Sequence, residues 1–341
     1  MDHARHRSVR EHWTAFRESP FLPAVVLLFI LAAAAGLFAG SYCYAMANPA
    51  PRHVPMAVTG HGESAHLVQA LDAGLDTSLS IRHYATYAAA RAAVDEQREF
   101  AILVLQGDRA QLDVAAAAGA SVSRLLTQAA PIAGQKTGVP LTVRDIKPLQ
   151  PTDPQGLAIF YISLASVIIG FVGAIQLSVH ARALNAGERI SFIAAYAVLG
   201  GLAICAVVDG LLGVLDLPFK ESWGICALTM FTSGMVFTMF NTLVGRWAMI
   251  PTWGLMVLIG NPSSGGAVSW PLLPSPLGLI GRWLPPGASV NAQHTAIYFH
   301  THQHVLPFIV LAAWSLVATT IFVVWRHRHP GGRDTAPAHA R

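Results

Sequence analysis

Asp209 is the residue best placed to do chemistry, because it lies near one end of an apolar stretch that covers residues 190–214. An ionisable side chain inside such a stretch is costly in lipid and marks a proton relay or a substrate contact. Ala197, Gly201 and Cys205 precede Asp209 at intervals of four residues, so the four share one helix face that we expect to pack on another helix. The alternative is that Asp209 lies at the level of the lipid head groups or caps a neighbouring helix.

Three histidines, His300, His302 and His304, alternate along the chain and follow His294. In an extended strand the three would point to the same side, and imidazole nitrogens bind zinc or copper. No thiolate or carboxylate accompanies them in the sequence, so the simpler interpretation is a solvated loop. These three residues are therefore weak candidates for a metal site, and we expect no metal and no other cofactor.

Sequence motifs of common enzymes are missing. The chain contains no G-x-x-x-x-G-K-[ST] phosphate loop, no H-E-x-x-H zinc motif and no G-x-S-x-G nucleophile motif. We therefore expect no catalytic residue, no enzymatic activity and no ATP hydrolysis by this chain. The net charge of +4 could suggest a nucleic-acid partner, but the basic residues mark the sides of a membrane instead, and we expect no nucleic acid.

The elements that must position these residues are apolar helices. The sequence is 53% hydrophobic and only 12% charged, with a mean hydropathy of +0.48, whereas roughly a quarter of the residues in a soluble protein are charged. An apolar stretch of about 20 residues crosses the hydrocarbon core of a lipid bilayer as a helix. The sequence predicts an α-helical integral membrane protein with six transmembrane helices, the fifth of them short, over residues 22–46, 157–179, 190–214, 223–244, 247–260 and 305–325.

Small and polar residues within these stretches indicate where helices meet. Gly36 and Gly40 form a G-x-x-x-G pair, and Gly170 and Gly201 lie in rows of small residues, so we expect all four glycines to allow close helix packing. Asn241 is expected to bond to a neighbouring helix or, like Asp209, to line a substrate path.

Residues 47–156 differ from the rest of the chain, because they hold nine of its 22 Lys and Arg residues. Runs with strand character alternate with helical runs, which is typical of an α/β layer domain. This predicted α/β domain is inserted between the first and second transmembrane helices and is large enough to bury its own core. Its strands are expected at 53–59, 78–83, 100–105 and 141–146, and its helices at 64–73, 86–98 and 115–130.

The stretch from residue 261 to residue 299, called the broken segment below, is apolar but interrupted by six prolines. A proline inside a helix removes a backbone donor and clashes with the preceding turn, so no membrane-crossing helix is expected here. Irregular backbone at membrane depth needs protein or water around it, which predicts a re-entrant or interfacial segment before the last helix. We expect a lid or gate with a flexible corner at Gly265 and Gly266, a stiff corner at Pro285 and Pro286, and outside access to Ser269 and Ser289.

Basic residues assign the two sides of the membrane. Five arginines fall on one side of the predicted helices, whereas the short loops on the other side hold only Lys220 and Arg282. Because positively charged loops stay inside, both termini are predicted to be cytoplasmic in the cell membrane, with the α/β domain and the broken segment extracytoplasmic. The five arginines are Arg182, Arg189, Arg246, Arg326 and Arg328. The chain ends are predicted as a basic amphipathic helix at 1–21 and a basic tail at 326–341, with a membrane bundle of five helices at 157–325.

Several stretches together resemble a known family. They are Tyr87–Val94 with Phe100–Leu105, Asp153–Leu157, Asn261–Gly266 and Trp283–Ala288. With the order of one anchor, one large outside domain and five further spans, they resemble the ABC-2 type membrane permease superfamily. The likeness is greatest to the branch of the YhgE/Pip-like phage-infection proteins and the DUF3533 family, and it covers residues 22–325.

The resemblance implies a transport permease fold with the broken segment over a lateral or central path, and it implies no particular substrate. We expect a permease or export component that moves a hydrophobic or amphipathic substrate outward. It is expected to act as a homodimer, with a separate ATP-binding subunit where ATP is used. Two alternatives stay open. One is a cell-envelope receptor or assembly protein that binds a partner through the α/β domain, and the other is proton-coupled efflux through Asp209.

Overall fold

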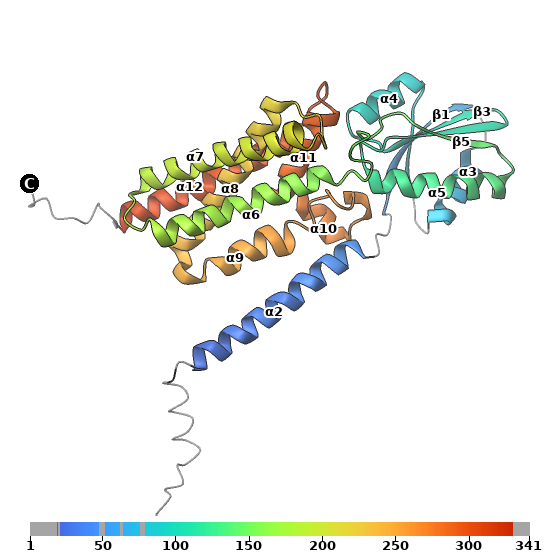
Figure 1. Ribbon diagram of the computed structural model, residues 1–341. Helices are drawn as coiled ribbons and strands as arrows, with labels where there is room; N and C mark the ends of the chain where they lie inside the picture. The colour runs from blue at the N-terminus through green and yellow to red at the C-terminus, as the bar shows by residue number, and fades with distance from the viewer. Residues whose placement is uncertain (1–18, 20, 48–51, 62–63, 76–78, 330–341) are drawn as a thin grey trace, which may run out of the picture.

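The computed structural model describes residues 19, 21–47, 52–61, 64–75 and 79–329. The basic helix predicted at 1–21 and the part of the tail from residue 330 onward lie outside the described residues, apart from Ser19 and Phe21. The described chain forms a bundle of long apolar helices with an α/β domain attached to one end of it (Figure 1). It is a helical protein with the α/β insertion that the sequence predicts.

The α/β domain contains a five-stranded sheet in the order β2-β1-β3-β4-β5. All neighbouring strands are parallel except β3 and β4, which form an antiparallel pair. Helices α3 and α5 pack together on one face, and α4 covers the other. The strands are β1 (Val54–His61), β2 (Leu79–His83), β3 (Ala101–Gln106), β4 (Arg109–Val114) and β5 (Leu141–Asp145), and the helices are α3 (Ser64–Leu75), α4 (Tyr87–Asp95) and α5 (Ala120–Thr137).

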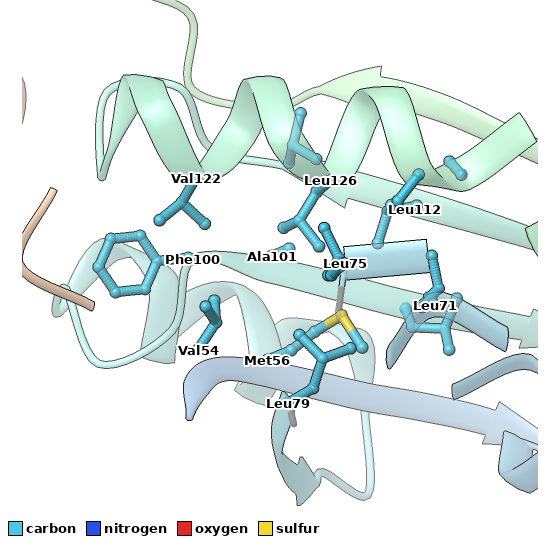
Figure 2. Packing of buried hydrophobic residues seen from close by; sticks show 14 of the residues in the cluster. Val54, Met56, Leu71, Leu75, Leu79, Phe100, Ala101, Leu112, Val122 and Leu126 are labelled. Atoms are coloured by element: carbon cyan, nitrogen blue, oxygen red, sulfur yellow. The ribbon is translucent and has the colours of Figure 1, made fainter. Parts of the chain in front are cut away.

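The domain core follows from the alternation of side chains along each strand. Met56 of β1 points toward α3 and α5, whereas the next residue, Ala57, packs with α4. Figure 2 shows the larger of the two cores, in which Met56 and Leu112 lie against Leu71 of α3 and Leu126 of α5. The domain thus buries apolar side chains on both faces of its sheet.

Strand β4 is the element that the sequence analysis missed. Its residues include Arg109, Gln111 and Asp113, so they lack the apolar character of the other strands. The two-residue Gly107-Asp108 turn, with a positive φ at Gly107, joins β3 to β4 as a hairpin. This turn is the feature of the sequence from which strand β4 could have been predicted. The predicted helix at 115–130 begins later than expected, at Ala120, after a turn that hydrogen-bonds Gly119 to Ala115 and Ala116.

Five helices are long and apolar enough to cross a membrane, and each overlaps a predicted span. They are α2 (Phe21–Met46), α6 (Ala158–His180), α7 (Ala186–Cys205), which continues as a π-helix over Ala206–Leu211, α8 (Phe219–Val244) and α12 (Leu306–Arg328). Polar caps fix two of their starts. The Asp153 carboxylate accepts the backbone N–H groups of Leu157 and Ala158, and Asn185 forms a capping box with Glu188.

The predicted fifth span, 247–260, does not form one long helix. Its place is taken by α9 (Met249–Trp253) and a π-helix over Gly254–Ile259. At about 1.5 Å per residue these reach only about 16 Å, half of a hydrocarbon core of about 30 Å. The helix is followed by turns that run from Gly260 into the broken segment. By length alone the described helices therefore give five spans and not six.

Helix α8 is the centre of the bundle, since it packs against α6, α7 and α12. Close approach depends on the glycines of its neighbours. A Cβ atom at Gly170 would lie 2.6 Å from the carbonyl oxygen of Met230, and one at Gly201 would lie 2.8 Å from the backbone nitrogen of Ala227. These two glycines of α6 and α7 therefore let two helix backbones meet α8.

Gly36 and Gly40 of α2 do not have this role within the chain. A Cβ atom at either position would meet no atom of the described chain within 4 Å. Helix α2 touches the bundle mainly where the Asn261 amide donates to the Tyr42 hydroxyl at 2.8 Å and where Phe38 lies beside Trp253. The close packing predicted for this glycine pair is absent from the described chain.

Candidate functional site

The prolines of the broken segment start short helices instead of interrupting a long one. Three of these short helices have proline at their first or second position, where the backbone N–H needs no partner within the helix. The prolines are Pro271, Pro276 and the pair Pro285-Pro286. The resulting elements are a 3₁₀ turn over Trp270–Leu272, α10 (Ser275–Ile280), a second 3₁₀ turn over Gly281–Trp283 and α11 (Pro285–Tyr298). The segment contacts α12, because Trp314 of α12 donates its indole N–H to the Trp283 carbonyl at 2.8 Å.

Helix α11 is the buried part of the broken segment, whereas α10 has no buried residue. Helix α11 packs against α6, α8 and α12 and is buried over most of its length. A Cβ at Gly281 would lie 1.7 Å from the Ser263 carbonyl oxygen, so two turns of the segment touch backbone to backbone. Ser289 is only 1% exposed and Ser269 is 8% exposed. The expectation that both serines are open to the outside is therefore wrong in this conformation.

The α/β domain is docked directly on the broken segment. Val268, Leu272 and Leu273 belong to the same buried cluster as the domain residues Val54 and Val122. The ring of Phe100, just before β3, lies 5.8 Å from that of Trp270 in an edge-on arrangement, a contact between the domain and the broken segment. The domain core therefore continues into the membrane bundle.

Hydrogen bonds fix the same junction. The Ser121 hydroxyl of α5 donates to the Ser269 hydroxyl at 2.8 Å and accepts the Ser269 backbone N–H at 2.9 Å. Gln97 donates its side-chain amide to the Thr295 hydroxyl of α11 at 3.0 Å. Gln97 has a φ of 57°, a left-handed conformation that is uncommon for a residue other than glycine. Such strain persists only where surrounding contacts hold it.

A hollow lies at this junction and defines the candidate site. It consists of a cavity of about 120 Å³ and a second of about 210 Å³. The two share four lining residues, Gln97, Trp270, Asn291 and His304, so we treat them as one junction hollow. Its walls come from the domain, the broken segment and the start of α12.

The predicted corners of the broken segment have separate places around this hollow. Gly265 and Gly266 line the smaller cavity, and Gly265 has a φ of 81°, which favours glycine. A Cβ at Gly266 would lie 3.0 Å from Phe160 and 3.1 Å from Val290. Pro285 and Pro286 are buried at the start of α11, outside the described lining. Of the two predicted corners, only the one at Gly265 and Gly266 therefore lies at the candidate site.

Asp209 lies away from the hollow. It falls in the π-helix that extends α7, and the change of helical repeat moves it off the buried face of Ala197 and Cys205. It is partly exposed and borders an open depression with Gln150 and Asp216, where the domain linker meets the bundle. This position agrees better with the alternative prediction, in which Asp209 lies at the end of a helix, than with a proton relay inside the bundle.

The remaining predicted site residues are not brought together. Asn241 is partly exposed near the end of α8, and its side chain forms no hydrogen bond with another described residue. His300, His302 and His304 lie in a turn in which the His302 N–H bonds to the Phe299 carbonyl, so alternate residues do not share a face. Within the described residues no group of three or more His, Cys, Asp or Glu side chains could hold a metal ion. The weak metal-site candidate is therefore wrong for this part of the chain.

Two buried carboxylates of the α/β domain differ in how fully they are bonded. Desolvation acts to raise the pKa of Asp113, but hydrogen bonds from Arg144, Tyr87 and Gln111 outweigh it and lower the pKa below its ordinary value. At Glu99, desolvation dominates and raises the pKa, because only one carboxylate oxygen is bonded, to Arg82 and Tyr84, while Oε2 has no partner among the described residues.

The residues that build the hollow were largely missed from sequence. Gln97 and Asn291 carry no motif, and His294 was noted only as a neighbour of the three alternating histidines. The one available signal is that Asn291, His294 and Tyr298 recur at helical spacing and so share a face of α11. Nothing in the sequence pairs that face with Gln97 or Phe100.

Together these features define a helical membrane-type protein whose inserted α/β domain is docked on the broken segment. The chain matches no protein-family model, no curated protein and no solved structure.

Proposed function

We propose that this chain is a non-enzymatic permease or export component of the ABC-2 type, which moves a hydrophobic or amphipathic substrate outward. Any ATPase would be a separate ATP-binding subunit, and the permease would act as a homodimer in the cell membrane. The observation that carries the proposal is the position of the broken segment, which is buried in the bundle and also joined to the core of the α/β domain. A movement of the domain is therefore transmitted to backbone inside the bundle.

The course of the chain supports six membrane crossings. Helix α8 runs away from the domain, and Arg326 near the end of α12 donates to the Leu184 carbonyl at the same far end of the bundle (Figure 1). Between α8 and α12 the chain returns to the domain through the short helix at 249–259 and the turns after it. A crossing made of half a helix and irregular chain is tolerated in a membrane only where protein surrounds it. Both described ends of the chain then share the side opposite the domain.

The interior of the bundle is polar where α11 meets α6 and α8. Thr229 donates to Ser289 at 2.9 Å, and Gln293 donates to the Ser222 carbonyl at 3.0 Å. The hydroxyls of Ser163 and Ser222 and the Oε1 atom of Gln293 are buried without a partner among the described residues. Buried polar atoms that lack partners are costly, so this arrangement favours a second conformation in which the bundle opens around the broken segment.

The test combines partner identification with transport. The protein is purified from its own membranes in mild detergent and examined for a co-purifying ATP-binding subunit by mass spectrometry. In parallel, inverted vesicles with and without the chain are assayed for ATP-dependent uptake of a fluorescent amphiphile. The proposal predicts both a partner and uptake that depends on the chain. Absence of both in repeated preparations would contradict it.

A receptor or assembly role is the second candidate, and the edges of the sheet favour it. Strands β2 and β5 end the sheet on either side, and β5 is exposed from Thr142 to Asp145. An open edge strand can pair with a strand of another protein. This role would be supported if the chain captured a partner through β5 and showed no transport in vesicles.

A further inference from the structure

The junction hollow has Arg282 as the charged side chain of its described lining. No acidic side chain belongs to its described lining, which instead includes Arg282, His294 and His304. Amide groups of Gln97, Gln155 and Asn291 add hydrogen-bond donors. A cation would find no counter-charge in this hollow, whereas an anion would find a guanidinium group and several donors.

Arg282 is the strongest of these groups, because its charge is not used by the protein. It is exposed and forms no ion pair with a described residue. Its guanidinium carbon lies 6.0 Å from the ring centroid of Trp270, which also lines the hollow. Arginine presents a planar fork of donors that matches the oxygens of a phosphate.

Two polar residues of α11 also line the junction hollow, Asn291 in both cavities and His294 in the smaller one, whereas Arg282 lines the larger one. Asn291 lines both cavities and commits one amide N–H to the Gly287 carbonyl, which leaves the other free. His294 lies one turn further along α11 and forms no hydrogen bond with a described residue, although its ring lies beside those of Tyr298 and Phe299. Donors from several elements suit a group with three or four acceptor oxygens better than one with two.

Exposed apolar side chains include Leu306 of the lining and two residues that are close to Arg282 in sequence. Trp283 is 56% exposed, Leu279 is 61% exposed and Leu306 is 41% exposed. Exposed tryptophan beside a basic residue is typical of the head-group level of a bilayer. A ligand held by its charged group in the hollow therefore has apolar protein surface, and the lipid beyond it, for an apolar tail.

We propose that the junction hollow binds a phosphate group, with Arg282 as its cationic partner and Asn291 and His294 as further donors, and that this phosphate is the head group of an amphipathic molecule. The inference rests on the proposed function only for the idea that this amphiphile is transported. The binding site itself is a separate claim. The same phosphate chemistry could be supplied by a soluble phosphate, so the experiment compares both sources.

The experiment measures binding to the purified full-length chain in a neutral detergent, without any transport step. Tryptophan fluorescence, to which Trp270 contributes as one of eight tryptophans, is recorded while short-chain phosphatidylglycerol is added, and the variants below assign the signal to the hollow. Diacylglycerol of the same chain length, which carries no phosphate, is the lipid control. Inorganic phosphate is added in competition.

The matched variants are Arg282→Gln and Arg246→Gln. Arg246 is likewise exposed and lies over a tryptophan, with its guanidinium carbon 5.4 Å from the Trp247 ring, but it is not in the described lining of the hollow. Loss of a charged hydrogen bond predicts that Arg282→Gln weakens phosphatidylglycerol binding by about tenfold or more, whereas Arg246→Gln leaves it unchanged. Arg282→Lys, which keeps the charge without the planar fork, is expected to show a smaller loss.

Each outcome decides the matter. Tight binding of phosphatidylglycerol that requires Arg282 and is not displaced by inorganic phosphate supports the lipid head group, and full displacement by inorganic phosphate supports a soluble phosphate at the same site. Equal binding of both lipids, or equal binding by wild type and Arg282→Gln, overturns the proposal. Vesicle uptake without such binding would overturn this inference alone, and binding without uptake would overturn only the transport role.

Discussion

Helices α2 and α11 differ in composition and in what covers them. Helix α2 is a nearly unbroken run of apolar residues, yet of its side chains only that of Ala45 is buried. Helix α11 begins with two prolines and contains Ser289, Asn291 and Gln293, yet most of its residues are buried. The more polar of the two helices is the one that the protein encloses.

The difference shows how burial follows from composition in a chain of this class. Lipid is as apolar as leucine, so large apolar side chains gain little from facing protein, while small and polar side chains allow close packing and hydrogen bonding. Proline and glycine in the broken segment are therefore signs of contact with protein. Substitutions at positions covered by protein should therefore have larger effects than those at positions that face lipid or water.

The largest expected effect is at the junction of the domain and the broken segment. Leu272 is 1% exposed and belongs to the domain core, so Leu272→Ala should lower the free energy of unfolding by about 2–5 kcal/mol. Leu279→Ala removes the same atoms from a side chain that is 61% exposed and should change it by about 0.5 kcal/mol or less. Chemical denaturation of the α/β domain in detergent measures both. Equal losses would mean that the domain core ends before the segment.

Glycine substitutions sharpen the contrast between covered and uncovered helices. Gly170→Ala places a Cβ 2.6 Å from the Met230 carbonyl oxygen and should lower stability by about 1–3 kcal/mol through overpacking. Gly36→Ala meets no described atom within 4 Å and should leave the melting temperature unchanged in detergent. A drop of similar size for Gly36→Ala would show that this face of α2 has a partner in the purified protein.

The two buried carboxylates give a smaller, pH-dependent contrast within the domain. The pKa of Glu99 is raised above its ordinary value of 4.5, so the folded state holds its proton more tightly and is stabilised below pH 4.5 but not at neutral pH. Glu99→Gln should therefore raise the melting temperature at pH 7, and this gain should shrink as the pH falls toward 4.5. A loss of stability at pH 7 would show that the bonds from Arg82 and Tyr84 outweigh desolvation.

Asp113 should behave in the opposite way. Its pKa is lowered below the ordinary value of 3.8, so its contribution is present above pH 3.8 and is lost as the pH falls through the folded value. Asp113→Asn should lower the free energy of unfolding at pH 7 by about 1 kcal/mol at most, because Arg144 is 58% exposed, and should lower the melting temperature accordingly. The melting temperatures of wild type and Asp113→Asn, measured from pH 7 to pH 3, should become equal at the acid end of this range.

The smallest effect is expected at Asp209. Because this side chain is partly exposed at the end of α7 and not enclosed by the bundle, Asp209→Asn should leave both stability and vesicle uptake within error of wild type. Loss of uptake with normal expression would instead support proton coupling through this residue.

The sequence predicted which stretches form helices and strands better than it predicted which of them pack together. Apolar length alone located α2, α6, α7, α8 and α12, because each must satisfy its backbone internally. Strand β4 was missed because Gln111 and Asp113 are polar. The Asp113 carboxylate accepts hydrogen bonds from Gln111 and from Arg144, which lies on another strand. Local pattern contains no information on such pairs.

The candidate site was harder to predict for the same reason. Gln97 and Thr295 are 198 residues apart in sequence and bond directly across the junction. Proline content correctly indicated that the broken segment forms no long helix, but whether a short helix is covered by protein depends on the glycines and serines that face it from elsewhere, such as Gly266 and Ser121. The sequence of the segment by itself predicted a lid, whereas in the fold its helix α11 is buried.

The central claim, that the α/β domain and the broken segment are one docked unit, is tested most directly by a disulfide across the junction. The Ser121 and Ser269 hydroxyl oxygens are 2.8 Å apart, so Ser121→Cys with Ser269→Cys should cross-link under mild oxidation in native membranes, detected as a linked peptide by mass spectrometry. The control pair joins Ser121→Cys to Ser178→Cys, near the far end of α6. A junction link at high yield with none in the control is the predicted result. No junction link, or equal yields from the two pairs, would contradict the docked arrangement.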